Sequence, residues 1–235
     1  SVEYPSDRVT VTFFGDGGTV GAVADGRVMT SPAKVKPGTS VKFTATPDAN
    51  NVFSQWKMNG TVVSNTATYT CTINADATVE AVFLKPTTVF LKPHDEWKFN
   101  NARFAIYYWN NSGNGWVDLK QLTCHDEYYT ADVPVGYSDI KFVRLNPANK
   151  DHNFNDGTCW NQTTDLTLPT NGNNLYDLTK IYLKPNANWK KDGARFAAYF
   201  YVKDDDSKTK WMSMLSTNEN GVYYCDVPTA HLYNK

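Results

Sequence analysis

The residues best suited to bind a ligand are aromatic side chains that alternate along one short segment. Tyr107 and Trp109 are two positions apart in the segment 102–109, and Trp116 opens the next segment. Residues two apart in a β-strand point to the same face, so Tyr107 and Trp109 would share a surface with Trp116 from the neighbouring strand. Flat rings beside polar groups suit the apolar faces and hydroxyl rims of sugars. The pattern predicts a shallow carbohydrate groove.

The aromatic segment occurs twice in the chain. Ten residues within 91–107 recur within 183–199 at a constant offset of 92 residues and without a gap. Such a repeat indicates tandem copies of one structural unit, and tandem units favour multivalent binding over a single buried active site. The second copy repeats the aromatic pattern with Tyr199, Tyr201 and Trp211.

An alternative interpretation of these aromatics stays open, because they could also pack beneath loops and bind nothing. Arg103 and Arg195 lie on the same predicted faces, and we interpret both as structural partners of carboxylates. Trp97 and Trp189 precede the strands in turns, and we expect them to cover the core rather than to contact a ligand.

The second copy is shorter than the first. No later residues match the strand predicted over 140–145 or the stretch 160–166 of the first copy. A β-sandwich without its last strands would expose sheet edges and core. We expect the missing strands to lie outside this sequence, to come from a neighbouring chain or to have been cleaved. Because the chain begins with Ser1, we also expect it to be a piece of a larger protein.

The N-terminal region alternates apolar and polar residues over 8–14, 39–46, 52–58, 67–73 and 78–83, which predicts β-strands. The run from Gly38 to Pro47, followed by Phe53, Trp56, Gly60 and Tyr69 and the closing run 77–83, resembles the divergent InlB-type B-repeat domains of bacterial surface proteins. That resemblance implies a spacer or stalk. We expect Trp56 to lie in the core rather than to form a ligand platform.

The repeated strand and the Trp that follows it resemble the starch-binding modules of carbohydrate-binding families 25 and 26. The resemblance implies β-sandwiches that bind starch, amylose or maltooligosaccharides, with Lys120 and Gln121 bonding sugar hydroxyls in the first copy. The second copy has Met214 and Leu215 near that position, which is a departure from the polar pair. The residues that the resemblance places on the α-glucan are Tyr107, Trp109, Trp116, Tyr199, Tyr201 and Trp211.

These observations predict an all-β chain: a small β-rich repeat domain, then two tandem β-sandwich modules, the second incomplete at its C-terminus. The predicted boundaries are 1–86 for the repeat domain, 87–174 for the first module and 175–235 for the second. The function predicted is non-catalytic binding of α-glucan by an extracellular or cell-surface bacterial protein. Two alternatives stay open: an adhesion or stalk protein without a glycan site, and an accessory region of a glycosidase whose catalytic domain lies outside this chain.

Other classes of function lack support in the sequence. The net charge is −1 and there is no basic stripe, which argues against nucleic acid and anionic membrane surfaces. No run of about 18 apolar residues is present, so no membrane insertion is expected. The adjacent pairs Asp95-Glu96 and Asp126-Glu127 do not supply the facing carboxylates of a glycosidase. We expect no catalytic residue, cofactor or metal site, and we interpret 151–157, which resembles a calcium loop, as a solvated Asn-rich loop.

The four cysteines form no C-x-x-C pair. Cys124 and Cys159 fall in the same complete copy and are therefore the one intradomain disulfide considered. Because the two copies do not share cysteine positions, we favour four reduced thiols, of which most are buried.

Overall fold

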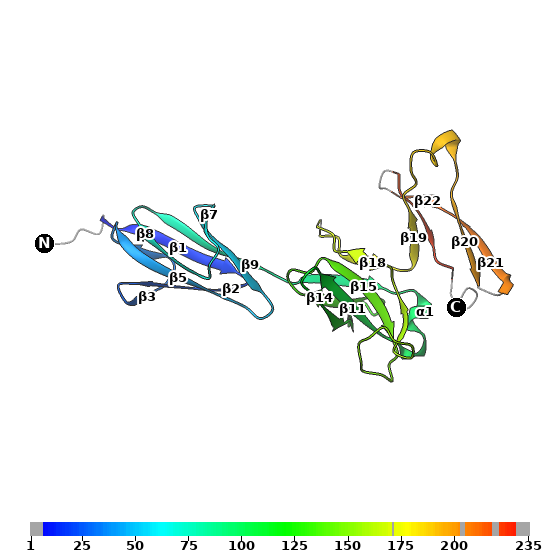
Figure 1. Ribbon diagram of the computed structural model, residues 1–235. Helices are drawn as coiled ribbons and strands as arrows, with labels where there is room; N and C mark the ends of the chain where they lie inside the picture. Colours follow the sequence, from blue (N-terminus) through cyan, green and yellow to red (C-terminus); the bar gives the residue numbers. More distant parts are fainter. Residues whose placement is uncertain (1–6, 171, 203–204, 218–220, 229–235) are drawn as a thin grey trace. The chain divides into compact units, whose positions relative to one another are not determined.

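A computed structural model describes residues 7–170, 172–202, 205–217 and 221–228, and it is almost entirely β (Figure 1). The chain divides into two compact units, with the boundary between Thr87 and Thr88. The predicted all-β class is confirmed. Within the described ranges, no helix has the length and apolar character that crossing a membrane requires.

The first unit is a sandwich of two sheets with strand orders β4-β1-β9-β6-β7 and β3-β2-β5-β8. The strands β1 and β9 pair in parallel, and the other pairs in the two sheets are antiparallel. The strands are β1 (Val9–Asp16), β2 (Gly18–Ala24), β3 (Arg27–Met29), β4 (Ala33–Val35), β5 (Thr39–Pro47), β6 (Val52–Met58), β7 (Thr61–Ser64), β8 (Thr68–Ile73) and β9 (Ala77–Leu84).

The core of this sandwich is built from the alternate residues that the sequence pattern marks as apolar. Val41 and Phe43 on β5 are fully buried, and so is Trp56 on β6. The Trp56 indole Nε1 donates a hydrogen bond of 3.0 Å to the Thr66 carbonyl, which satisfies its polar atom. The prediction that Trp56 is a core residue is confirmed. Gly18 is needed where the sheets meet, because a Cβ there would lie 2.5 Å from the Phe83 ring.

The first copy is also a two-sheet sandwich, with orders β13-β14-β10-β18 and β12-β11-β15-β16, and β17 pairs with β15. Its core contains Phe104 and Ile106 on β11 and Phe142 on β15, all buried as the period-2 pattern predicts. The elements are β10 (Thr87–Lys92), α1 (Asp95–Lys98), η2 (Phe99–Asn101), β11 (Arg103–Asn110), β12 (Gly113–Asp118), β13 (Lys120–Gln121), β14 (Tyr129–Val133), β15 (Asp139–Leu145), β16 (Cys159–Gln162), β17 (Leu166–Thr167) and β18 (Leu175–Asp177).

The segment that Trp116 opens forms two strands, because buried Leu119 carries the chain from one sheet to the other between β12 and β13. One predicted module boundary differs from the structure. The second module was expected to begin at residue 175, yet β18 pairs in parallel with β10 and extends the first copy's sheet. The division of residues 88–228 into two modules otherwise stays a prediction.

The second copy has sheets β19-β23-β22 and β20-β21, which correspond to β10-β14-β13 and β11-β12 of the first copy. In the part of the chain that the structure describes, no strand of this copy corresponds to β15, β16 or β17. Ile181 is consequently 40% exposed, whereas its counterpart Val89 is fully buried. The elements are β19 (Lys180–Leu183), η3 (Lys191–Gly193), β20 (Ala197–Val202), β21 (Asp205–Ser213), β22 (Leu215–Ser216) and β23 (Tyr223–Asp226).

The repeated Trp residues have different environments in the two copies. Trp97 on α1 is only 5% exposed and covers the core, which confirms the prediction for the first copy. Trp189 is 59% exposed, so the same prediction is wrong for the second copy. Both lie between the same Leu-Lys-Pro and Ala-Arg-Phe-Ala runs, but the described strands that surround them differ.

All four cysteines are free thiols, so the intradomain pair Cys124–Cys159 is not bonded. Cys124 is exposed, Cys71 and Cys159 are half-buried, and Cys225 is buried. Burial raises the pKa of the Cys71, Cys159 and Cys225 thiols.

Alkylation is therefore expected to modify Cys124 before the other three cysteines. The thiolate is the reacting species, and burial of the other thiols reduces both their access to reagent and their thiolate fraction. Iodoacetamide treatment of the native protein at neutral pH, followed by peptide mass spectrometry over time, measures the order. Modification of Cys225 as fast as Cys124 would contradict the burial described for β23.

Candidate functional site

The predicted aromatic pair lies on the outer face of β11, the face that also carries Arg103 and Ala105. The rings of Tyr107 and Trp109 are stacked, with centroids 5.4 Å apart and planes at 24°. Tyr107 lies between two neighbouring strands, opposite Trp116 on β12 and opposite Lys141 on β15. The strand pairing thus brings the three predicted aromatics together.

Trp116 is half-buried, as Tyr107 and Trp109 are, and it lies in a small cluster of rings. Its ring lies 5.0 Å from Tyr107, 4.8 Å from Phe154 and 5.6 Å from His152. This cluster covers the buried side chains Ala105, Val143 and Leu145 on the outer face of the same sheet. Trp116 therefore supports the aromatic pair from beneath Phe154.

A hollow of about 610 Å³, here called the first groove, lies over the outer face of β11. Its aromatic lining consists of Tyr107, Trp109 and Phe154, and its polar lining includes Lys141, Gln162 and Asp165. Lys141 Nζ forms an ion pair of 2.9 Å with Asp165 and lies 5.8 Å from the Phe154 ring centroid. Apolar rings with an adjacent amide, ammonium and carboxylate can contact both the faces and the hydroxyls of a sugar.

The predicted polar pair Lys120 and Gln121 does not belong to this groove. Both residues lie on β13 in the opposite sheet, where they pair with Thr130 and Tyr129. The Gln121 side-chain amide donates a 2.5 Å hydrogen bond to the Asp126 carbonyl. The resemblance placed this pair beside the aromatics, but the chain changes sheet at Leu119, so the assignment of Lys120 and Gln121 is wrong.

Among the residues that line the first groove, Phe154, Lys141, Gln162 and Asp165 were not predicted from the sequence. Lys141 carried a usable signal, because it alternates with the buried residues Ile140 and Phe142 on β15 and so faces outward. Phe154 carried no periodic signal, since it lies in the irregular segment between β15 and β16.

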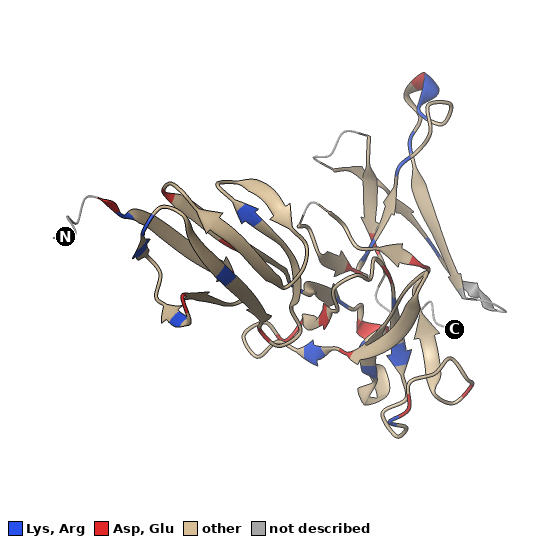
Figure 2. Ribbon diagram, turned by 60° about the vertical axis from the view of Figure 1, so that its left-hand side comes forward, with Lys and Arg blue, Asp and Glu red and all other residues tan. Residues whose placement is uncertain are grey.

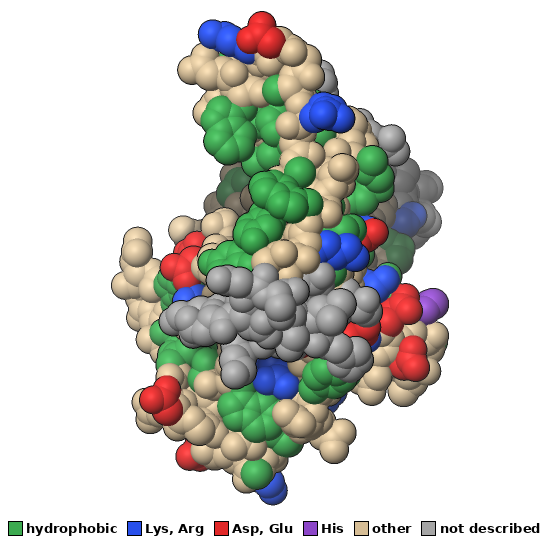
Figure 3. Space-filling model, turned by 90° about the vertical axis from the view of Figure 1, so that its right-hand side faces the viewer, with side chains coloured by type: hydrophobic (Ala, Val, Ile, Leu, Met, Phe, Trp, Pro, Cys, Tyr) green, Lys and Arg blue, Asp and Glu red, His purple; other side chains and the backbone are tan. Residues whose placement is uncertain are grey.

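The second copy repeats the aromatic arrangement in a more exposed form, here called the second platform: Tyr199, Tyr201 and Trp211. Tyr199 stacks with Tyr201 at 6.0 Å and contacts Trp211 at 4.8 Å, and Tyr199 and Trp211 are opposite one another in the β20–β21 pair. The three residues are 46%, 63% and 69% exposed, respectively. Figure 3 shows hydrophobic side chains exposed at several places on one face of the molecule.

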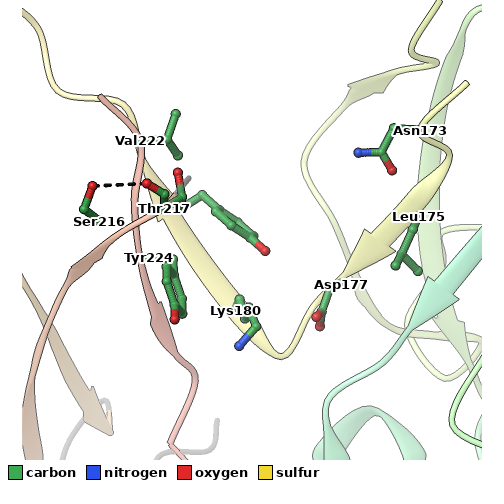
Figure 4. A pocket seen from close by; sticks show the side chains of 9 residues that line it. Asn173, Leu175, Asp177, Lys180, Ser216, Thr217, Val222 and Tyr224 are labelled. Carbon is green, nitrogen blue, oxygen red and sulfur yellow. Dashed lines mark hydrogen bonds between the residues drawn. The ribbon is translucent and has the colours of Figure 1, made fainter. Parts of the chain in front are cut away.

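Another hollow, of about 590 Å³, lies where the chain passes from β18 to β19 (Figure 4). Lys180 lines it, forms a 2.5 Å ion pair with Asp226 and lies 5.0 Å from the ring centroid of Tyr224. No residue of the first groove or the second platform lines this hollow.

The prediction that Arg103 pairs with a carboxylate is confirmed, since its guanidinium forms an ion pair of 2.9 Å with Asp118. Acidic and basic residues are interspersed along the ribbon (Figure 2), as expected for a chain of net charge −1. Among the described residues, no group of three or more His, Cys, Asp or Glu side chains could hold a metal ion.

Comparison with known proteins gives a family match for part of the chain and remote similarity to several solved structures. No curated protein matches the chain. Among solved structures, the chain is similar to the "product complex of a multi-modular glycogen-degrading pneumococcal virulence factor SpuA", with 10% identity and a TM-score of 0.24. The match covers 97% of this chain but only 35% of that one, and similarity this low carries no argument about function. Residues 18–87, which include β2 to β9, match the model of the divergent InlB B-repeat domain.

Proposed function

We propose that this chain is a non-catalytic part of an extracellular or cell-surface bacterial protein and that it binds α-glucan. The ligands are starch, amylose and maltooligosaccharides, held by the first groove and the second platform. The observation that supports the proposal is the stacked aromatic pair on an outer sheet face, present in both copies at the same register. The pair of the second copy is exposed, and exposed aromatic surface is typical of interaction sites.

The chemistry of the first groove fits a neutral sugar better than a charged ligand. Its one ammonium group, on Lys141, is already paired with Asp165. The rings of Tyr107 and Trp109 offer flat apolar area, and Gln162 offers an amide to a hydroxyl. A polyanion would require uncompensated positive charge, which this groove does not present.

Each site is expected to be weak when it acts alone. Two stacked rings suggest a dissociation constant on the order of 0.1 to 1 mM, or about −4 to −5.5 kcal/mol. Two sites on one chain can engage the same polysaccharide, which raises the overall avidity without any new contact. This gain is a physical reason for the duplication.

A second candidate function is a spacer or stalk without a glycan site, and the family match of residues 18–87 favours it for the first unit. The two functions are compatible, because a spacer can carry binding modules. They differ in whether residues 88–228 contact carbohydrate.

Electrophoresis in a native gel that contains amylose tests the proposal. We expect the protein to migrate more slowly there than in a plain gel, because it is transiently bound to an immobile polymer. A gel that contains a soluble β-linked glucan serves as the control for viscosity and for non-specific association. Equal mobility in all three gels would overturn the proposed function and favour the stalk.

A further inference from the structure

The first groove has a wall that the second platform lacks, and the wall comes from the loop 146–158 between β15 and β16. This loop is held in shape by its own side chains. Asn146 Nδ2 donates to the Gly157 carbonyl at 2.8 Å, and Asn149 Nδ2 donates to Thr158 Oγ1 at 2.7 Å. The Thr158 side chain is 96% buried, so this contact is protected from water. The segment 151–157 is mostly exposed, as predicted for a solvated Asn-rich loop, and these hydrogen bonds also hold it in one shape.

Arg103 ties this loop to the sheet. Its Nε donates to the Asn149 carbonyl at 3.0 Å, and its Nη2 donates to the Asp151 carbonyl. Its Nη1 bonds Asp118 on β12 at 2.9 Å and lies 3.2 Å from His152 Nε2. A guanidinium can make these contacts at once because its donors form a rigid planar fork, which the single ammonium of a lysine does not reproduce.

The result of this anchoring is the position of Phe154. Its ring lies edge-on to Tyr107 at 5.1 Å and packs on Trp116 at 4.8 Å. Phe154 remains 43% exposed, and it lines the first groove beside Tyr107 and Trp109. One side of the ring therefore packs on the protein and another borders the groove.

The second copy supplies an internal comparison. It keeps the arginine, as Arg195, and the tryptophan, as Trp211, but no described residues form a counterpart of loop 146–158. Arg195 is exposed, and Trp211 is 69% exposed, whereas Trp116 is half-buried. The two copies thus present similar aromatic residues, once with a wall and once as an open face.

We propose that Arg103 is a positioning residue which, through loop 146–158 and Phe154, strengthens the binding of an α-glucan chain in the first groove. This inference rests on the proposed function. A groove with a floor and a wall contacts a sugar ring on more than one side, so Phe154 adds contact area to that of Tyr107 and Trp109.

The test uses the full chain with Trp211→Ala as background, so that maltoheptaose reports only on the first groove. Titration calorimetry is expected to show about tenfold weaker binding for Arg103→Lys and for Phe154→Ala. The double variant should be no weaker than Phe154→Ala alone, because Arg103 acts through Phe154 and the two effects are then not additive. Arg195→Lys is the matched control and should change nothing.

Three outcomes would overturn this role of Arg103. They are unchanged affinity in Arg103→Lys, additive losses in the double variant, and hydrogen exchange of residues 146–158 that Arg103→Lys does not accelerate. Binding of maltoheptaose that is lost in Trp109→Ala but not in Arg103→Lys would reject this inference alone. Absence of binding by the unmodified chain would reject the proposed function together with it.

Discussion

Replacing Trp97 with alanine is expected to lower the free energy of unfolding of the first copy by about 3 to 5 kcal/mol, whereas the same change at Trp189 should cost about 1 kcal/mol or less. Trp97 is 5% exposed and stacks on Phe104 at 6.0 Å, so its removal leaves a cavity in the core. Trp189 stacks on Phe196 at 6.4 Å in the same way but is 59% exposed. Water already contacts most of that ring.

Because the chain contains more than one compact unit, a global unfolding curve would mix their transitions. Native-state hydrogen exchange of the full chain resolves them, since the amides of β11 report on the first copy and those of β20 on the second. Trp97→Ala should accelerate exchange in β11 strongly, and Trp189→Ala should change exchange in β20 little. Equal effects of the two substitutions would mean that Trp189 is covered in solution.

This pair also shows what the sequence could not reveal. Trp97 and Trp189 lie between the same Leu-Lys-Pro and Ala-Arg-Phe-Ala runs, and from this shared position the sequence predicts the same burial for both. Their burial differs because β15 and β16 complete the first sandwich, and the described part of the second copy has no counterpart of them. Burial is a property of the assembled layers, and a repeat transfers it only when the neighbouring strands are repeated too.

The alternation of apolar and polar residues predicted the buried face correctly where a strand stays in one sheet. It placed Phe104 and Ile106 in the core and Arg103 beside a carboxylate, and both outcomes are confirmed. It failed at Lys120, because the apolar-polar pattern continues through Leu119 while the chain crosses to the other sheet. A period-2 pattern does not reveal where the chain changes from one sheet to the other.

The position of Phe154 in the first groove could not be predicted from sequence patterns, for a different reason. Its position depends on hydrogen bonds from Arg103, which is 46 residues from Asn149 in the sequence. The Asn-rich segment 146–158 has no periodicity, and its order comes from side-chain bonds to its own backbone. The residues of the candidate site that lie on the strand β11 could therefore be predicted from the sequence. Phe154, which lies in the loop 146–158, could not.

The combined variant Trp109→Ala and Trp211→Ala is expected to abolish retention in amylose gels, with each single variant retaining part of it. Trp109 is the better target in the first copy, because removing Trp116 would also remove the support of Phe154. Losing a stacking ring from the centre of a site costs about 2 kcal/mol, which is roughly a 30-fold loss of affinity. A site on the order of 0.1 to 1 mM then binds too weakly to slow migration.

Each single variant should lose only part of the retention, because the two sites are linked in one chain. When both sites engage one polymer, avidity exceeds either affinity by about 10² to 10⁴, so losing either site removes that gain but leaves one weak contact. Phe14→Ala is the matched control, because Phe14 is 48% exposed on β1 of the first unit and lies outside both sites. Undiminished retention of a folded double variant would mean that the aromatic faces are not the contact surfaces. Full loss in one single variant alone would mean that only one copy binds, and the avidity argument would then fail.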